Sequence, residues 1–298
     1  MSGADASALK AHIAELERQL QVAKALLGRA ESTSTPTNGG LLLPTGSSLH
    51  NLLLLADSAL PLGSFAYSSG LESFLAHHKA SAASPLSGAT IFKPFQQFLK
   101  LSVYTVAHTN IPYVLACFRD PSALTGLDND LDASTPCTVA KRASIAQGRA
   151  LVSVWEKAFA KTARHRFIAG RSEAATALIT FSADLKMAAI SNETITVNGH
   201  LAPVWGAAAL SLGLSMEETG YVFLLNHAKA VVSASVRASV MGPYQAQDLL
   251  ASEMLQALIK ESLEKVWLLE PEDAGQAVPA MDLWIGRHEL LYSRIFNS

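Results

Sequence analysis

Hydrophobic residues recur at intervals of three and four along most of the chain, a spacing that places them on one face of a helix. Only Glu193–Val197 alternates in the manner of a strand, and only weakly. We therefore predict an all-α fold, a single bundle of about eight to ten helices. Besides a helix that restarts near Ser69, the predicted helices cover residues 92–116, 139–167, 171–190, 201–212, 215–240, 245–269 and 281–296.

Residues 1–30 carry a separate pattern. Apolar residues follow the a/d spacing of a heptad at Leu9, Ile13, Leu16, Leu20, Ala23 and Leu27. This spacing predicts an amphipathic helix, either a lone one or a short coiled coil used for dimerisation or docking. Residues 31–48 are rich in Ser, Thr, Gly and Pro and are typical of a flexible linker. The helical domain then covers residues 49–298, with an acidic, turn-rich loop at 120–136.

The sequence also marks where helices begin and end. A Ser-x-x-Glu pair at a helix start predicts a capping box, in which each residue satisfies a free backbone N–H. Such pairs are Ser69 with Glu72 and Ser215 with Glu218. Other residues have the chemistry of turns and helix ends. We assign these roles to Asp57, Pro61, Gly63 and Gly213.

Composition narrows the class of protein. Hydrophobic residues make up 49% and charged residues 16%, which favours a folded chain over a disordered one. The net charge of −2 gives no support to nucleic-acid binding. Residues 194–216 lack any charged residue, but they contain Asn198, Gly199 and Pro203. We expect a buried helix there rather than a membrane span.

The cysteine count and the N-terminus bear on location. Two cysteines without a CxxC pair are too few for a disulfide framework and favour a reducing compartment. Asp5, Glu15 and Glu17 argue against a signal or transit peptide. We expect a cytoplasmic protein.

Motifs of common enzyme classes are missing. The chain has no GxxxxGK[ST], no GxGxxG after a strand and no GxSxG elbow. The histidines are scattered, and the adjacent pair His77 and His78 would make a poor chelate on a helix. Core or surface histidines are the simple interpretation, and transient nickel contacts at His200 and His227 are the alternative. We expect no stably bound cofactor.

Two further segments suggest interaction surfaces. A basic stretch contains Lys157, Lys161, Arg164, Arg166 and Arg171. It is either a solvated helix face or a docking surface for an acidic protein. The tail at residues 287–298 reads RHELLYSRIFNS and is unusually apolar for a chain end. Such a tail either docks on the body of the chain or is ordered by a partner.

Several of these segments together resemble the UreF family of urease accessory proteins. Residues 52–72 (LLLLADSALPLGSFAYSSGLE) resemble the family's N-terminal motif, and residues 199–214 (GHLAPVWGAAALSLGL) resemble a central one. SIAQGRAL at 144–151, the segment from Val222 to Leu249 and the ending LYSRIFNS are also similar. The chain departs from the pattern at Ser64, where a second glycine is common, and at the inserted Ala202.

The resemblance implies an all-helical homodimer that is not an enzyme. Such a protein would bridge a scaffold subunit (UreD/UreH) and the GTPase UreG. The complex would deliver nickel to apo-urease, coupled to hydrolysis of GTP that the GTPase binds. It would need no membrane and no nucleic acid. The eukaryotic-type ending favours a fungal or plant-like member.

The resemblance also frames a hypothesis for the tail. When a scaffold subunit orders the tail, Arg294 would reach the turn around Phe65 and Tyr67, with Tyr292 and Phe296 as further partner-binding residues. Two other classes stay open. One is a helical adaptor of an unrelated complex, and the other is an all-helical small-molecule enzyme that uses Asp57, Tyr67 or a histidine as acid or base.

Overall fold

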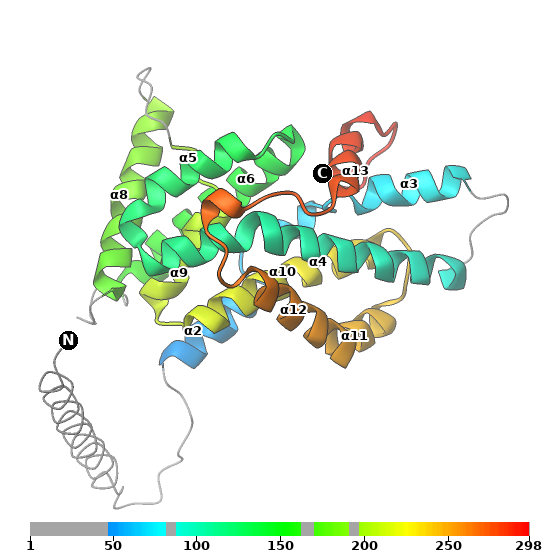
Figure 1. Ribbon diagram of the computed structural model, residues 1–298, viewed down its shortest axis with the longest axis horizontal. Coiled ribbons are helices and arrows are strands. Elements are labelled where there is room, and N and C mark those ends of the chain that lie inside the picture. The colour runs from blue at the N-terminus through cyan, green and yellow to red at the C-terminus, as the bar shows by residue number, and fades with distance from the viewer. Residues whose placement is uncertain (1–46, 82–87, 162–169, 191–196, 298) are drawn as a thin grey trace, which may run out of the picture. The chain divides into compact units, whose positions relative to one another are not determined.

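The computed structural model describes residues 47–81, 88–161, 170–190 and 197–297. The chain divides into two units, residues 1–44 and 45–298, and the second contains everything described below. Within these ranges the structure has eleven α-helices and no strand, which confirms the all-α prediction (Figure 1). The predicted N-terminal helix, nearly all of the linker and most of the ETITV segment lie outside the described residues.

The helices follow one another with short connections. They are α2 (Ser47–Ala56), α3 (Leu71–Ser81), α4 (Gly88–Arg119), α5 (Leu124–Ser134), α6 (Thr138–Val154), α8 (Arg171–Ile190), α9 (Leu201–Leu212), α10 (Met216–Arg237), α11 (Pro243–Ala251), α12 (Glu253–Val266) and α13 (Pro279–Arg287). Short helical turns include η1 (Ser64–Ala66), the π-helical turn η3 (Trp155–Phe159) and η5 (His288–Leu290).

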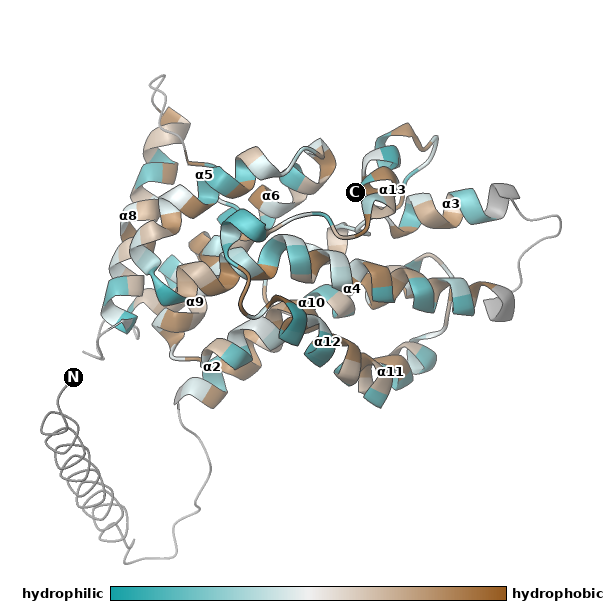
Figure 2. Ribbon diagram, viewed as in Figure 1, coloured by the Kyte–Doolittle hydropathy of each residue, from teal (hydrophilic) through white to brown (hydrophobic). Residues whose placement is uncertain are grey.

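Helices α4 and α9 form the centre of the second unit. Helix α4 packs against α9, α10 and α12, and α9 also packs against α6 and α8 (Figure 1). Ten of the twelve residues of α9 are buried. The uncharged stretch noted in the sequence is therefore a core helix, as predicted. No helix in the described ranges has the length and apolarity that crossing a membrane demands. Figure 2 shows hydrophobic and hydrophilic residues interspersed along α4 and α12, so each of these helices is mixed in character.

Two glycines allow the helices around α9 to approach closely. A Cβ on Gly206 would lie 2.2 Å from the carbonyl oxygen of Val114 in α4. A Cβ on Gly148 in α6 would lie 2.1 Å from the carbonyl oxygen of Gly199. Both separations are far below van der Waals contact, so only glycine fits at these positions without backbone movement.

The turn between α9 and α10 follows its sequence signals. Gly213 has φ 84°, and the next N–H, that of Leu214, donates to the carbonyl of Ala209 at 3.1 Å. Ser215 and Glu218 then form the predicted capping box, with bonds of 2.7 and 3.1 Å. Local chemistry alone therefore specifies this helix–helix connection.

The prediction of a solvated acidic loop at 120–136 is wrong. The segment forms a short turn and then α5, in which Leu124, Leu127 and Leu131 are buried. Their spacing of three and four residues places them on one face against the core. The charged residues made the segment resemble a loop, although Asp128 is itself fully buried and satisfied by hydrogen bonds.

Three predicted helices also have different bounds. The helix expected over 92–116 is longer, because α4 continues through both Pro94 and Pro112. The helix expected over 245–269 is two helices, since Ser252 lies in an extended conformation and its Oγ accepts the N–H of Leu255 at 3.2 Å. The last predicted helix ends early: α13 and η5 stop at Leu290, and a non-helical tail follows.

Candidate partner-binding site

Hydrogen bonds within the segment between α2 and η1, and others from neighbouring elements, hold its backbone in place. Asp57 Oδ1 accepts the N–H of Ala59 at 2.9 Å, which closes the turn before Pro61. Gly63 has φ 72°, a conformation that few other residues adopt, and it starts η1. We call residues 57–67 the aromatic turn, after Phe65 and Tyr67. Phe65 is 63% exposed, and Tyr67 is partly buried.

Helix α10 holds the end of α2 against this turn. Asn226 Nδ2 donates to the carbonyl oxygen of Leu55 at 2.8 Å, and Lys229 Nζ donates to that of Ala56. The two side chains lie one helical turn apart and satisfy carbonyls that have no partner within α2. Partial burial lowers the pKa of Lys229, and the nearby carboxylate of Asp57 opposes this shift.

The predicted capping box at Ser69 and Glu72 is wrong. Helix α3 begins at Leu71, after Ser69 and Gly70, which both have positive φ. The N–H of Glu72 instead donates to Ser68 Oγ at 3.4 Å. The Glu72 carboxylate is thereby free to bind residues that are far away in sequence.

Glu72 anchors the C-terminal tail, residues 291–297. Its Oε1 accepts the N–H of Ile295 at 2.7 Å, and its Oε2 accepts the N–H of Phe296 at 3.3 Å. Nε2 of His288 lies 3.0 Å from the same Oε2. The Glu72 side chain is only 12% exposed and that of His288 is fully buried. Of the two alternatives for the tail, the structure has the docked one.

Arg237, the last residue of α10, joins the tail to the aromatic turn. Its guanidinium carbon lies 4.3 Å from the ring centroid of Phe296, and its Nη1 donates to the carbonyl oxygen of Phe65. The N–H of Asn297 donates to the carbonyl of Ala66 at 2.8 Å. The sequence hypothesis gave this connecting role to Arg294. In the described part of the chain, Arg237 makes these contacts instead.

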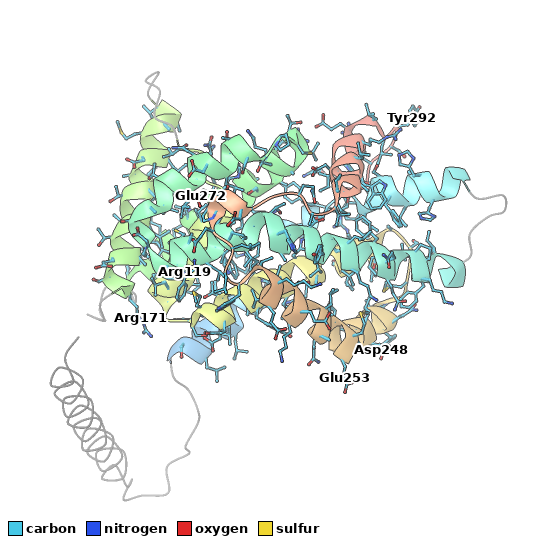
Figure 3. All side chains as sticks on the ribbon, in the orientation of Figure 1. Arg119, Arg171, Asp248, Glu253, Glu272 and Tyr292 are labelled. Carbon is cyan, nitrogen blue, oxygen red and sulfur yellow. The ribbon has the colours of Figure 1, made fainter. Side chains whose placement is uncertain are left out.

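Exposed apolar side chains surround this junction. Helix α13, shown in red in Figure 1, lies against α3, and the tail follows it. Tyr292 points away from the ribbon and is fully exposed (Figure 3). The other large exposed apolar residues here are Phe65, Leu283, Leu290 and Ile295. Apolar side chains that gather on adjoining elements and stay open to solvent are a common mark of a protein-binding surface.

A cavity of about 320 Å³ lies behind the aromatic turn. Its walls come from that turn and from α4, α6, α10 and α13, and they include Tyr67, Thr105 and Ile285. His227 of α10 also lines it, with Nε2 2.8 Å from Ser102 Oγ. Burial lowers the pKa of His227 to about 4, so the imidazole is neutral at physiological pH.

His200 has a different environment. It is fully buried, its Nε2 lies 3.1 Å from Asp132 Oδ1 and its Nδ1 lies 3.0 Å from Ser144 Oγ. Burial alone would raise the pKa of Asp132, but hydrogen bonds from Lys141 and His200 hold it below its ordinary value. Because protein groups occupy both ring nitrogens, we do not retain His200 as a nickel contact. Among the described residues, no three His, Cys, Asp or Glu side chains lie close enough together to hold a metal ion.

The basic stretch is only partly described. Lys157 is exposed within the π-helical turn η3, and Lys161 is exposed just after it, whereas Arg164 and Arg166 lie outside the described residues. Arg171 is partly buried, and its Nη2 donates to the carbonyl of Gly213 at 3.3 Å. Arg171 therefore helps to hold α8 against the end of α9, a role that the sequence did not suggest.

Two residues of the site were missed in the sequence. Arg237 lies inside a segment that resembles the UreF pattern, but nothing in its spacing marked it. His288 was one of the scattered histidines. Arg237 acts through partners 59 and 172 residues away and His288 through one 216 residues away, so local pattern gave no signal for either.

The chain is similar in sequence to known proteins. The family model UreF matches residues 93–253. A protein of Schizosaccharomyces pombe named "Uncharacterized urease accessory protein UreF-like" is 35% identical over 249 residues, which cover 84% of this chain and 97% of that protein. "Urease accessory protein 6" of Cryptococcus neoformans is 26% identical, over 86% of this chain and 99% of its own length. "Urease accessory protein F" of Arabidopsis thaliana is also 26% identical, over 82% and 90%. The chain belongs to the UreF family of urease accessory proteins.

Proposed function

We propose that this chain is a non-catalytic subunit in urease maturation, acting in the cytoplasm as a homodimer. It bridges a UreD/UreH-type scaffold subunit and a UreG-type GTPase, and the assembly inserts nickel into apo-urease while the partner hydrolyses GTP. Family membership supports the role in maturation. The exposed apolar surface around the docked tail is the observation that supports a bridging protein.

The tail surface is the first proposed partner site. It consists of Phe65, Leu283, Leu290, Tyr292 and Ile295. Because these side chains are already exposed, a partner can bury them without unfolding the tail. Burial of large apolar and aromatic side chains supplies most of the binding energy at such sites. The scaffold subunit is the partner we assign to this surface.

The exposed lysines of the basic stretch are the second proposed site. Lys157 lies in η3 and Lys161 lies just after it, away from the elements that form the tail surface. Exposed like charges steer an oppositely charged partner and make its association sensitive to salt. We assign this face to the GTPase. Reversing both charges should slow association, most strongly at low salt, and an unchanged rate would remove this assignment.

His227 is the residue we retain for a transient nickel contact. Its neutral imidazole opens onto the cavity, and neutral imidazole nitrogen suits nickel. A single histidine among hydroxyl groups would bind the ion weakly, as a protein that passes nickel onward requires.

The decisive experiment is reconstitution with purified scaffold subunit, GTPase, apo-urease, nickel and GTP. Urease activity that depends on this chain would support the proposal. The double variant Tyr292→Ser/Ile295→Ser should lose scaffold binding. Tyr244→Ser is the matched control, because Tyr244 is 91% exposed on α11, outside the tail surface.

The outcomes separate the alternatives. Scaffold binding that survives the double variant would move the interface elsewhere. Absence of any binding to either partner would favour an adaptor of a different complex. Turnover of a small molecule by the isolated chain would favour the enzyme alternative.

A further inference from the structure

The Glu72 carboxylate accepts three hydrogen bonds from the C-terminal end of the chain. The donors are Ile295 N–H, Phe296 N–H and His288 Nε2–H, at 2.7, 3.3 and 3.0 Å. An ionised carboxylate can accept all three, whereas a protonated one turns one of its oxygens into a donor. This arrangement therefore requires Glu72 in its charged form, and charge-assisted bonds of this kind are the stronger ones.

His288 adds a second requirement on protons. The ring is fully buried, and its Nδ1 has no hydrogen-bond partner within the described part of the chain. With the proton on Nε2, the ring donates to Glu72 and leaves only a lone pair at Nδ1. A second proton would place an N–H at Nδ1 in a buried position without an acceptor, a desolvation cost that opposes the attraction between the imidazolium and the Glu72 carboxylate.

The charges around this pair come from α3, α6, α10, α13, η5 and the tail. Arg237 of α10 stacks on Phe296, and Arg142 of α6 bonds Glu289 at 2.7 Å. Arg294 of the tail interacts with Glu289 as well. Among the side chains that the structure describes, the remaining titratable or charged ones on α3, α13 and η5 are His77, His78, Asp282 and Arg287. Glu289 pairs with Arg142, and the carboxylate that bonds His288 is that of Glu72.

We propose that Glu72 and His288 form a proton-dependent latch, which holds the C-terminal tail on the chain at neutral pH and releases it in acid. A proton on Glu72 removes an acceptor of the tail's N–H groups, and a proton on His288 creates a buried donor without an acceptor. Release frees Phe296 from Arg237 and Asn297 from Ala66. The aromatic turn, which forms one wall of the cavity, then loses its bonds to the tail.

The latch can be tested on the full chain without any partner, so its failure would not affect the proposed function. A fluorophore is attached at Tyr292→Cys, where the side chain is fully exposed, in a Cys137→Ser background. The other cysteine, Cys117, is buried, and burial raises the pKa of its thiol to about 12, so it should not react. Fluorescence anisotropy is followed from about pH 8 to about pH 5, the range in which an imidazole titrates.

We expect the anisotropy to fall as the pH is lowered, while far-UV circular dichroism stays constant. Glu72→Gln should show the low value at every pH. Glu261→Gln is the matched control, since it removes an exposed carboxylate of α12, outside α3, η5 and the tail, and it should behave like the parent. His288→Gln keeps an amide donor but cannot take up a proton, so its anisotropy should fall less on acidification than that of the parent.

Three results would overturn the latch. The first is an anisotropy that does not change, or that rises, as the parent chain is acidified. The second is a Glu72→Gln chain that folds and keeps its tail ordered at neutral pH. The third is identical release by the parent and by His288→Gln, which would leave the imidazole without a part in it. The titration of the labelled parent needs neither Glu72→Gln nor His288→Gln, and an unchanged or rising anisotropy rejects the latch even if those variants fail to fold.

Discussion

The carboxylate of Asp128 accepts the backbone N–H of His200 at 2.6 Å. The same carboxylate accepts the N–H groups of Asn198 at 2.6 Å and of Gly199 at 3.0 Å. These three N–H groups belong to residues just before the first turn of α9, so α5 provides a cap for this buried helix. A carboxylate at a helix N-terminus is favourable because it accepts hydrogen bonds from free backbone N–H groups and because its negative charge interacts with the positive end of the helix dipole.

Replacing Asp128 should therefore destabilise the fold. Asp128→Asn keeps the size but loses the charge, and its amide group turns a donor towards backbone N–H groups. We expect a loss of about 2–4 kcal/mol in the free energy of unfolding, measured by urea titration. Asp130→Asn, two residues away on the exposed face of α5, should change stability by less than about 0.5 kcal/mol. Equal effects of the two variants would contradict the capping role.

The close approach at Gly148 makes a second prediction. Gly148→Ala places a Cβ against the backbone of residues 199–201 and should lower stability by about 1–3 kcal/mol or prevent folding. Gly126→Ala is the control, because nothing lies within 4 Å of its added Cβ and alanine favours the helix. Thermal unfolding should show a lower midpoint for the first variant and an equal or higher one for the second. A tolerated alanine at 148 would show that α6 and α9 can separate.

His227 should make stability depend on pH. Its pKa is lowered to about 4 in the folded chain, while an unfolded chain has the ordinary value of 6.5. Between these two values only the unfolded state binds the proton, so stability falls as the pH drops through this window. The loss is no more than about 3 kcal/mol.

A matched variant isolates that contribution. His227→Gln can still bond Ser102 but does not titrate. The parent should therefore lose stability relative to the variant as the pH falls from 6.5 to about 4, and the difference in their unfolding free energies should stay constant above pH 6.5. Urea unfolding at a series of pH values measures this. Parallel curves for the two proteins across the window would show that the cavity solvates the imidazole as water does.

Arg237 should control the order of the tail. Arg237→Ala removes the cation–π contact with Phe296, worth about 0.5–2 kcal/mol, and the bond to the carbonyl of Phe65. Amide hydrogen exchange in the peptide covering residues 291–297, measured by mass spectrometry, should become faster than in the parent. Arg294→Ala is the comparison, since the sequence hypothesis gave it this role, and its exchange should match the parent. Faster exchange in Arg294→Ala alone would restore the earlier hypothesis.

Arg294 remains informative for partner binding. If ordering by a scaffold subunit brings Arg294 to the aromatic turn, Arg294→Ala should weaken binding of both scaffold and GTPase. If Arg237 alone makes that connection, both affinities should equal those of the parent. Titration calorimetry with each partner distinguishes the two cases.

The sequence by itself determined the helices whose ends are set by nearby residues. The predicted bounds 171–190 and 201–212 agree with α8 and α9. The cap at Gly213 and the box at Ser215 also follow their local signals. These features depend on periodicity and on residues within one turn of each other, and such interactions form in the same way wherever the helix lies in the fold.

Only the tertiary structure decided what the acidic residues do. The sequence assigned Glu72 to a local cap and residues 120–136 to a solvated loop. In the fold, Glu72 binds donors 216 to 224 residues away, and Asp128 caps a helix 70 residues further on. A carboxylate costs free energy when buried unless N–H groups satisfy it, and which N–H groups reach it depends on how distant helices pack. Periodicity describes one helix at a time, so it carries no record of those distant partners.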